Sequence, residues 1–180
     1  MPNTFTAIAL DLTDNTSPYG SVHIRDKTTV GERLAAAGIK AAYGGTAGYV
    51  QGPTVRSAAF DKQQGVLKVT FSNTGAQGLD VKAAGPNDVA FEWCSKNCTM
   101  TGAAGDGWLP AKVSAFDQST VTLAHAGLGA RARGAVHGDG PVLVRYAWAA
   151  VPYQYKAAVL YGGDSKDEML PAGGFVIPAE

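Results

Sequence analysis

From about residue 52 onward, the sequence is a succession of short runs of β-forming residues separated by glycine, asparagine, aspartate and proline. The run VLKVTF at 66–71 alternates apolar and polar side chains, so Leu67, Val69 and Phe71 share one face of a half-buried strand. Short strands at this spacing, without helical periodicity between them, predict an antiparallel β-sandwich domain over residues 51–180. Further runs of this kind lie at 88–94, 111–117, 119–125 and 141–149.

The first fifty residues have a different pattern. The run FTAIALDL at 5–12 is almost continuously apolar, which is typical of a strand buried on both faces of a parallel sheet. A helix follows, with Thr29 and Glu32 as a capping box or Asp26 as an earlier N-cap, and Gly44-Gly45 ends it. The apolar face of this helix is predicted at helical spacing, on Val30, Leu34, Ala37 and Ala41.

Residues 1–50 therefore predict a strand, a loop and a helix, the parts of one βα unit. Such a unit cannot close a core alone, because a parallel strand needs neighbours and a crossover helix needs a sheet to cover. We therefore expect a missing partner, either an upstream segment or a separate chain.

The composition excludes several classes of partner. The 180 residues include 15 basic and 15 acidic side chains, so the chain shows no electrostatic preference for nucleic acid or an anionic membrane. No apolar run approaches the roughly 20 residues that span a bilayer, and the N-terminal sequence lacks the basic start of a secretory signal. No dinucleotide, phosphate-loop or metal-ligand motif occurs, so we expect no cofactor and no metal.

The leading candidate for chemistry is His23, in the loop SPYGSVHIRDK at 17–27. A histidine titrates near neutral pH, and a loop after the carboxyl end of a parallel strand is a common position for a general base. The alternative is an ordinary surface histidine, and Ser17 and Ser21 beside it are interpreted as turn residues. His125 and His137 lie far away in the sequence, and we interpret both as solvent-facing.

Cys94 and Cys98 lie close together in CSKNC. The spacing fits a disulfide across a tight turn, and two free thiols are the alternative. Zinc would need two further ligands, which the neighbouring sequence lacks.

The segment RYAWAAVPYQYKAAVLY, 145–161, is rich in aromatic residues. Such rings either pack in a β-domain core or stack on sugar rings, and core packing is the simpler account. Arg145 and Lys156 either pair with carboxylates across the domain junction or are solvated. The aromatic residues concerned are Tyr146, Trp148, Tyr153, Tyr155 and Tyr161.

Residues 1–44, the WLPA sequence at 108–111, the segment 144–161 and the LPAGGF sequence at 170–175 together resemble the sialate O-acetylesterase family. The resemblance implies an SGNH-type serine esterase that removes O-acetyl groups from sialic acids or related sugars. It further implies that residues 1–50 are the C-terminal strand, loop and helix of an SGNH-like α/β domain. The family's catalytic serine lies in a GQSN-like block, which this sequence lacks and which would lie upstream.

The family's catalytic histidine block aligns with VHIRDK and falls on His23, with Ile24 in the place of a proline. General SGNH enzymes carry an aspartate three residues before the histidine, and Gly20 stands there in this sequence. The orienting acid is therefore expected from Asp14 or Asp11, or its role falls to a backbone carbonyl. Cysteines of some relatives are replaced by Tyr153 and Ala158.

The resemblance thus implies the C-terminal part of a carbohydrate esterase, a serine carboxylic-ester hydrolase that is inactive alone and active with an upstream segment. Its substrate would be an O-acetylated sugar, and the parent enzyme is expected to be extracellular, lysosomal or periplasmic. The alternative is a non-catalytic β-sandwich module that binds carbohydrate or a partner protein.

Overall fold

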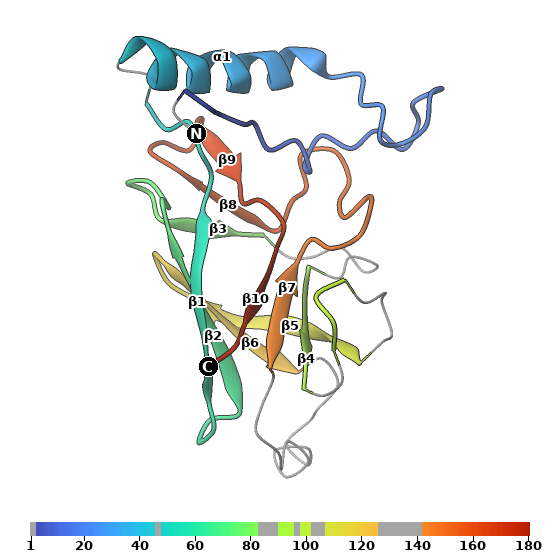
Figure 1. Cartoon of the computed structure of the whole chain (residues 1–180), viewed down its shortest axis with the longest axis vertical. Coiled ribbons are helices and arrows are strands. Elements are labelled where there is room, and N and C mark those ends of the chain that lie inside the picture. Colours follow the sequence, from blue (N-terminus) through green and yellow to red (C-terminus); the bar gives the residue numbers. More distant parts are fainter. Residues whose placement is uncertain (1–2, 46–47, 83–89, 96–97, 102–106, 126–141) are drawn as a thin grey trace. The chain divides into compact units, whose positions relative to one another are not determined.

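The structure is a computed structural model that describes residues 3–45, 48–82, 90–95, 98–101, 107–125 and 142–180 (Figure 1). Its contacts group the chain into two compact units that are interleaved along the sequence. The first unit contains Met1–Thr54, Asn73–Ala83 and Ala149–Gly173, and the second contains Val55–Ser72, Ala84–Trp148 and Gly174–Glu180. The first unit therefore includes two later segments beside the N-terminal residues that we predicted as a separate piece.

The helix of the first unit, α1, spans Lys27–Tyr43. Asp26 is its N-cap, and the carboxylate accepts a hydrogen bond of 2.9 Å from the backbone N–H of Thr29. Gly44 ends the helix in the left-handed conformation, with φ of 62°, as the Gly-Gly pair predicts. Of the two N-caps that the sequence allows, the structure therefore uses Asp26.

The predicted apolar face of α1 is only partly covered. Ala37 is buried, whereas Leu34 keeps 38% of its surface exposed, and Ile39 and Tyr43 are exposed as well. Within the described residues, α1 therefore covers little apolar surface.

The strand predicted for residues 5–12 is absent from the structure. The segment is irregular, and its chain turns where the N–H of Leu12 donates to the carbonyl of Ala9 at 3.0 Å. A strand exists only when a neighbour completes its hydrogen bonds, and none of the described strands pairs with these residues.

The remaining regular structure of the first unit is a small antiparallel sheet of three strands in the order β3-β8-β9. They span Leu79–Val81, Leu160–Gly163 and Met169–Pro171. All four residues of β8 are buried, and Ala158, Val159 and Ala172 are buried around it. This sheet is the centre of the first unit's core.

The second unit contains a seven-stranded antiparallel sheet in the order β1-β2-β6-β5-β4-β7-β10. The predicted alternation is confirmed in β2, where Leu67, Val69 and Phe71 are buried and their neighbours are not. The strands are β1 (Thr54–Asp61), β2 (Val66–Ser72), β4 (Phe91–Cys94), β5 (Trp108–Phe116), β6 (Thr120–His125), β7 (Leu143–Tyr146) and β10 (Phe175–Pro178).

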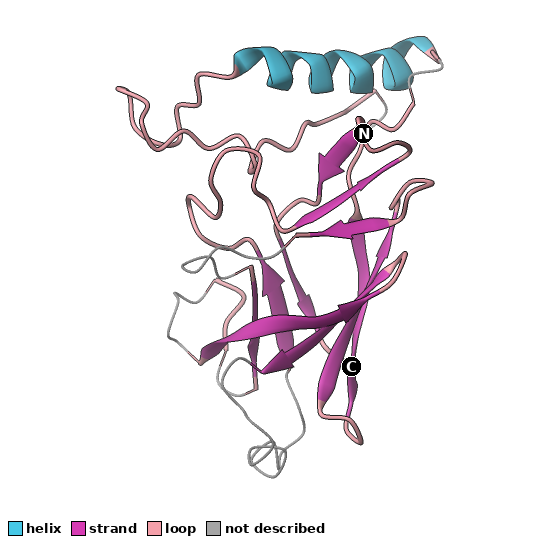
Figure 2. Cartoon of the chain, turned by 180° about the vertical axis from the view of Figure 1, so that it is seen from behind, coloured by secondary structure: helices cyan, strands magenta, loops and turns pink. Residues whose placement is uncertain are grey.

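The two edges of this sheet meet. The N–H of Phe60 in β1 donates to the carbonyl of Glu180 at 2.7 Å, and the N–H of Glu180 donates to the carbonyl of Ala58 at 2.9 Å. The predicted mostly β, antiparallel fold is confirmed, and the sheet is nearly barrel-shaped where we expected two facing sheets (Figure 2). Aromatic rings pack against one another on this sheet, among them those of Phe71, Phe91, Tyr146 and Phe175.

Arg145 is buried within the second unit, with 1% of its surface exposed. It lies opposite Glu92 on the neighbouring strand, and its Nε donates to the carboxylate at 2.7 Å. Its guanidinium also lies 4.1 Å from the ring centroid of Trp108. Arg145 therefore pairs inside the sheet, and its expected pairing across a domain junction is not what the structure shows.

Candidate functional site

His23 lies in a loop of successive turns between Asp14 and Arg25, in the first unit. The N–H of Gly20 donates to the carbonyl of Ser17 at 3.2 Å, and the N–H of His23 donates to the carbonyl of Gly20 at 2.9 Å. The hydroxyl of Ser17 donates to the carbonyl of His23 at 2.8 Å. Ser17 is therefore a turn residue, as predicted, and it fixes the backbone of His23 without touching the imidazole.

The imidazole of His23 is exposed and makes no hydrogen bond or ion pair with any residue that the structure describes. Its backbone is held at both the amide and the carbonyl, as above. The structure therefore fixes the backbone of His23 and leaves its imidazole accessible to a further group.

Asp14, one of the two predicted acid partners, is bonded to Arg25. Arg25 donates from Nε and from a terminal nitrogen to the two carboxylate oxygens at 2.5 and 2.9 Å, and Thr16 donates to the same carboxylate. The hydrogen bond from Arg25 holds the pKa of Asp14 well below its usual range. Asp14 is thus a charged acceptor for Arg25 and has no bond to His23.

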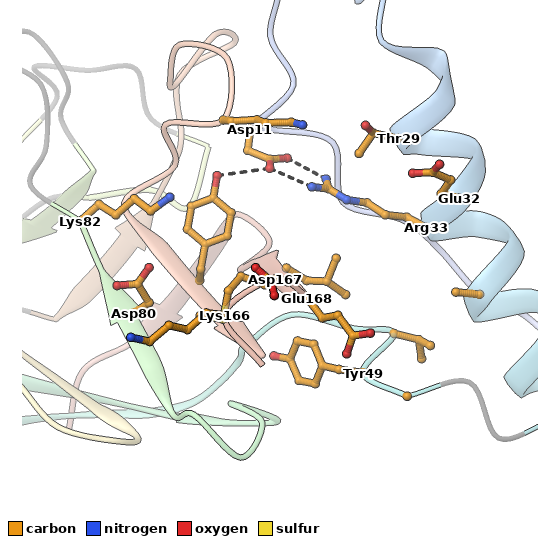
Figure 3. A pocket seen from close by; sticks show the side chains of 17 residues that line it. Asp11, Thr29, Glu32, Arg33, Tyr49, Asp80, Lys82, Lys166, Asp167 and Glu168 are labelled. Atoms are coloured by element: carbon orange, nitrogen blue, oxygen red, sulfur yellow. Dashed lines mark hydrogen bonds and ion pairs between the residues drawn. The ribbon is translucent and has the colours of Figure 1, made fainter. Parts of the chain in front are cut away.

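Asp11, the other predicted acid partner, is buried, with 1% of its surface exposed. Arg33 of α1 donates to its two oxygens at 2.8 and 2.9 Å, and the hydroxyl of Tyr161 in β8 donates at 3.2 Å (Figure 3). Burial raises the pKa of Tyr161, and the charge of Asp11 adds to this shift. Asp11 is thus bonded to Arg33 and Tyr161 in the described contacts, and the choice of the acid that orients His23 stays a prediction.

Gly20, at the position of the usual SGNH aspartate, has a φ of 95° and open space where a Cβ would lie. Residues with a side chain rarely adopt this backbone conformation. The turn therefore requires glycine at this position, and no acid is available three residues before His23.

A cavity of about 630 Å³ lies beside the Asp11–Arg33 pair in the first unit. Figure 3 shows side chains of both charges around it, among them Glu32, Asp80 and Lys82. The ammonium of Lys82 lies 4.2 Å from the ring centroid of Tyr161. The lining is thus polar and of mixed charge, and it does not select one class of ligand.

A second cavity, of about 350 Å³, lies next to the His23 loop. Both ends of the loop line it, at Thr13 and Asp14 on one side and Arg25 and Asp26 on the other, together with Tyr155. Tyr155 comes from the segment after β7, and its hydroxyl donates to Asp26 at 2.6 Å. No local sequence pattern indicates this contact, because its partners are 129 positions apart.

The structure also places the other candidate residues. Cys94 and Cys98 are joined by a disulfide, and Cys94 is buried at the end of β4. His137 lies outside the described residues, as does the side chain of His125. Within the described ranges, no three histidine, cysteine or acidic side chains gather as metal ligands, and no helix is long and apolar enough to cross a membrane.

The aromatic residues after β7 divide into two groups. Tyr146, Tyr153 and Tyr161 are buried, as core packing predicts, whereas Trp148 and Tyr155 keep 41% and 51% of their surface exposed. Lys156 is exposed, and its backbone N–H donates to the carbonyl of Asp11 at 2.5 Å.

Comparison with known proteins gives one consistent result. Residues 56–179 match the protein family described as "Sialate O-acetylesterase C-terminal domain". Proteins named sialate O-acetylesterase from Mus musculus, Pongo abelii and Homo sapiens are 35%, 34% and 33% identical to the chain, each over 98% of its length. These alignments cover 28% of the mouse protein and 29% of each of the other two, so the chain spans under a third of these relatives.

Proposed function

Since the chain belongs to the family of sialate O-acetylesterase C-terminal domains, we propose that it supplies the catalytic base, His23, to a serine-dependent carbohydrate O-acetylesterase. The nucleophile would lie in an upstream esterase segment, in the same or a separate chain, as the family resemblance implies. The substrate class is an O-acetylated sialic acid or a related sugar.

The observation that carries the proposal is that His23 combines an ordered backbone with an exposed imidazole. Its backbone is fixed by Ser17 and Gly20, while its imidazole is exposed and unpartnered among the described residues. A base that must meet a serine from another segment needs both the order and the exposure.

Exposed apolar side chains in the N-terminal region support the expected upstream segment. They lie on the chain before α1, on the His23 loop and on α1 itself, all within the first unit. Such side chains gain stability when another surface covers them. They are Phe5, Val22, Leu34, Ile39 and Tyr43.

The proposed reaction has two stages. The upstream serine attacks the acetyl carbonyl while His23 accepts the hydroxyl proton, and His23 then donates that proton to the departing sugar oxygen. Water attacks the acetyl-enzyme in the second stage, with His23 again accepting a proton, and acetate leaves as the serine regains its proton. Because Asp14 and Asp11 are bonded to arginines, we expect the group that orients the imidazole to come from the upstream segment.

The disulfide between Cys94 and Cys98 supports an oxidising location for the parent enzyme. An extracellular, lysosomal or periplasmic enzyme would meet this condition.

The test joins this chain to the upstream part of the mouse relative, in place of the residues that it matches, and measures hydrolysis of 4-nitrophenyl acetate and of an O-acetylated sialic acid. We expect the joined protein to be active, the chain alone to be inactive, and His23→Ala to reduce kcat by at least about 10³-fold. Asn15→Ala is the matched control, because Asn15 is an exposed residue of the same loop.

Two results would overturn the proposal. One is a folded joined protein without activity, and the other is a His23→Ala variant as fast as its parent. Binding of a glycan array by the chain alone, together with either result, would favour the non-catalytic binding module.

A further inference from the structure

The segment after β7 contacts the chain on both sides of the His23 loop. The hydroxyl of Thr13 donates to the carbonyl of Tyr153, and the N–H of Lys156 donates to the carbonyl of Asp11 at 2.5 Å. At the other end of the loop, the hydroxyl of Tyr155 donates to Asp26 at 2.6 Å. Residues 153–156 therefore join the chain before the loop to the chain after it.

We propose that residues 153–156 form a clasp on the His23 loop, and that Tyr155 is a positioning residue for His23. This inference rests on the proposed function of His23. It assigns to Tyr155 a role that acts through Asp26 and not through contact with substrate.

The carboxylate of Asp26 links Tyr155 to the end of the His23 loop. It follows His23 by three residues, and its carboxylate also accepts hydrogen bonds of 2.9 and 2.7 Å from the backbone and the hydroxyl of Thr29. The start of α1 and the end of the loop are thus fixed at one carboxylate. The hydroxyl of Tyr155 is a further donor to this carboxylate, and it comes from a distant part of the chain.

The hydrogen bond of Tyr155 can be removed by substitution with little change in the packing of its ring. Tyr155 keeps 51% of its surface exposed, and Tyr155→Phe keeps the ring and its contacts while removing the hydroxyl. The hydroxyl bond stabilises the charged carboxylate, and it is the main reason that the pKa of Asp26 falls to about 2. A hydrogen bond to a charged group is also stronger than one between neutral groups.

Support of this kind matters for a base on a loop. A shift of about 1 Å in a catalytic group can reduce the rate about 10²-fold. The clasp holds the chain on both sides of His23, so the imidazole keeps its place before the serine arrives. Loss of the Tyr155 hydroxyl would release one side only.

The first experiment measures amide hydrogen exchange of Tyr155→Phe in the chain alone, which needs no esterase activity. We expect exchange at residues 21–26 to be about 10-fold faster than in the parent, while the strands of the seven-stranded sheet are unchanged. Tyr43→Phe is the control, because Tyr43 is 85% exposed and has no hydrogen bond from its hydroxyl among the described residues. Equal exchange in Tyr155→Phe and the parent would overturn the clasp.

The second experiment uses the active joined protein. Tyr155→Phe should reduce kcat about 10-fold with KM little changed, and it should have no further effect in a His23→Ala background. A full additional loss in that background would show that Tyr155 does not act through His23 and would overturn the positioning role. If the joined protein is inactive, the function fails, while the exchange result still decides whether the clasp exists.

Discussion

Arg33 holds Asp11 with two parallel hydrogen bonds, of 2.8 and 2.9 Å, inside the first unit. A second aspartate–arginine pair, between Asp14 and Arg25, lies on the His23 loop and also has two hydrogen bonds, here from Nε and one terminal nitrogen. The two pairs differ in burial: the side chain of Arg33 is 12% exposed and that of Arg25 is 59% exposed. Their contributions to stability should therefore differ strongly, because solvent weakens an exposed ion pair.

The first prediction compares Arg33→Met with Arg25→Met. Arg33→Met leaves the buried carboxylate of Asp11 without its cation, and we expect a loss of about 3–5 kcal/mol in the free energy of unfolding. Arg25→Met leaves Asp14 near water, so its effect should be much smaller. Urea unfolding followed by circular dichroism measures both. Equal losses in the two variants would contradict the structural role that we assign to Asp11.

The second prediction concerns Gly75, which has a φ of 75° and lies against the backbone of Gly163 in β8. A Cβ at Gly75 would overlap the carbonyl group of Gly163, whereas a Cβ at Gly44, with φ of 62°, would meet open space. Gly44→Ala should cost only the left-handed strain, about 1–2 kcal/mol. Gly75→Ala should cost a further 1–3 kcal/mol or so from overpacking. Thermal unfolding of both variants tests this order, and a Gly75→Ala variant no less stable than Gly44→Ala would contradict it.

The third prediction concerns the disulfide between Cys94 and Cys98, which closes a loop with a sequence separation of 4. A loop this short restricts the unfolded chain only modestly, so reduction should lower the free energy of unfolding by about 2 kcal/mol. Urea unfolding with and without dithiothreitol measures the change, and the Cys94→Ala/Cys98→Ala double variant should not respond to the reductant. Titration of two free thiols in the untreated chain would show that the disulfide does not form.

The fourth prediction concerns pH. The hydrogen bond from Tyr155 is the largest cause that lowers the pKa of Asp26, from 3.8 to about 2. A carboxyl group with a lowered pKa in the folded chain stabilises the fold above its unfolded pKa of 3.8, and this stabilisation is lost as the pH falls toward 2. Carboxyl carbon NMR should therefore show Asp26 titrating near pH 2 in the parent and closer to 3.8 in Tyr155→Phe. Titration of the parent near 3.8 would mean that the bond is not formed in solution.

Features that depend on a few neighbouring residues could be predicted from the sequence. The alternation in 66–71 predicts which side chains of β2 are buried, and the Gly-Gly pair predicts the end of α1. Each of these follows from local backbone geometry and from the side-chain period of one element. The same local reasoning identified Ser17 as a turn residue.

Features that depend on distant segments could not be predicted in this way. The apolar run at 5–12 has the composition of a buried strand, but a strand also needs a partner, and its composition does not show whether one is present. Asp11 and Asp14 follow that run as acids beside a histidine would, yet arginines at 33 and 25 hold them. The aromatic ring of Tyr155 predicts core packing or stacking on a sugar, whereas its hydroxyl donates to Asp26 beside the His23 loop.

The meeting of β1 with Glu180 has a consequence for how the second unit folds. Phe60 and Glu180 are about 120 positions apart in the chain, and their hydrogen bonds close the seam between the two edges of the sheet. Contacts of such long range raise the contact order, so the chain must lose much of its entropy before the seam forms. Until that moment both edges offer unpaired N–H and C=O groups to other molecules. In the folded sheet, the bonds of Glu180 to Ala58 and Phe60 occupy backbone groups of β1 that could otherwise pair with the edge strand of another molecule.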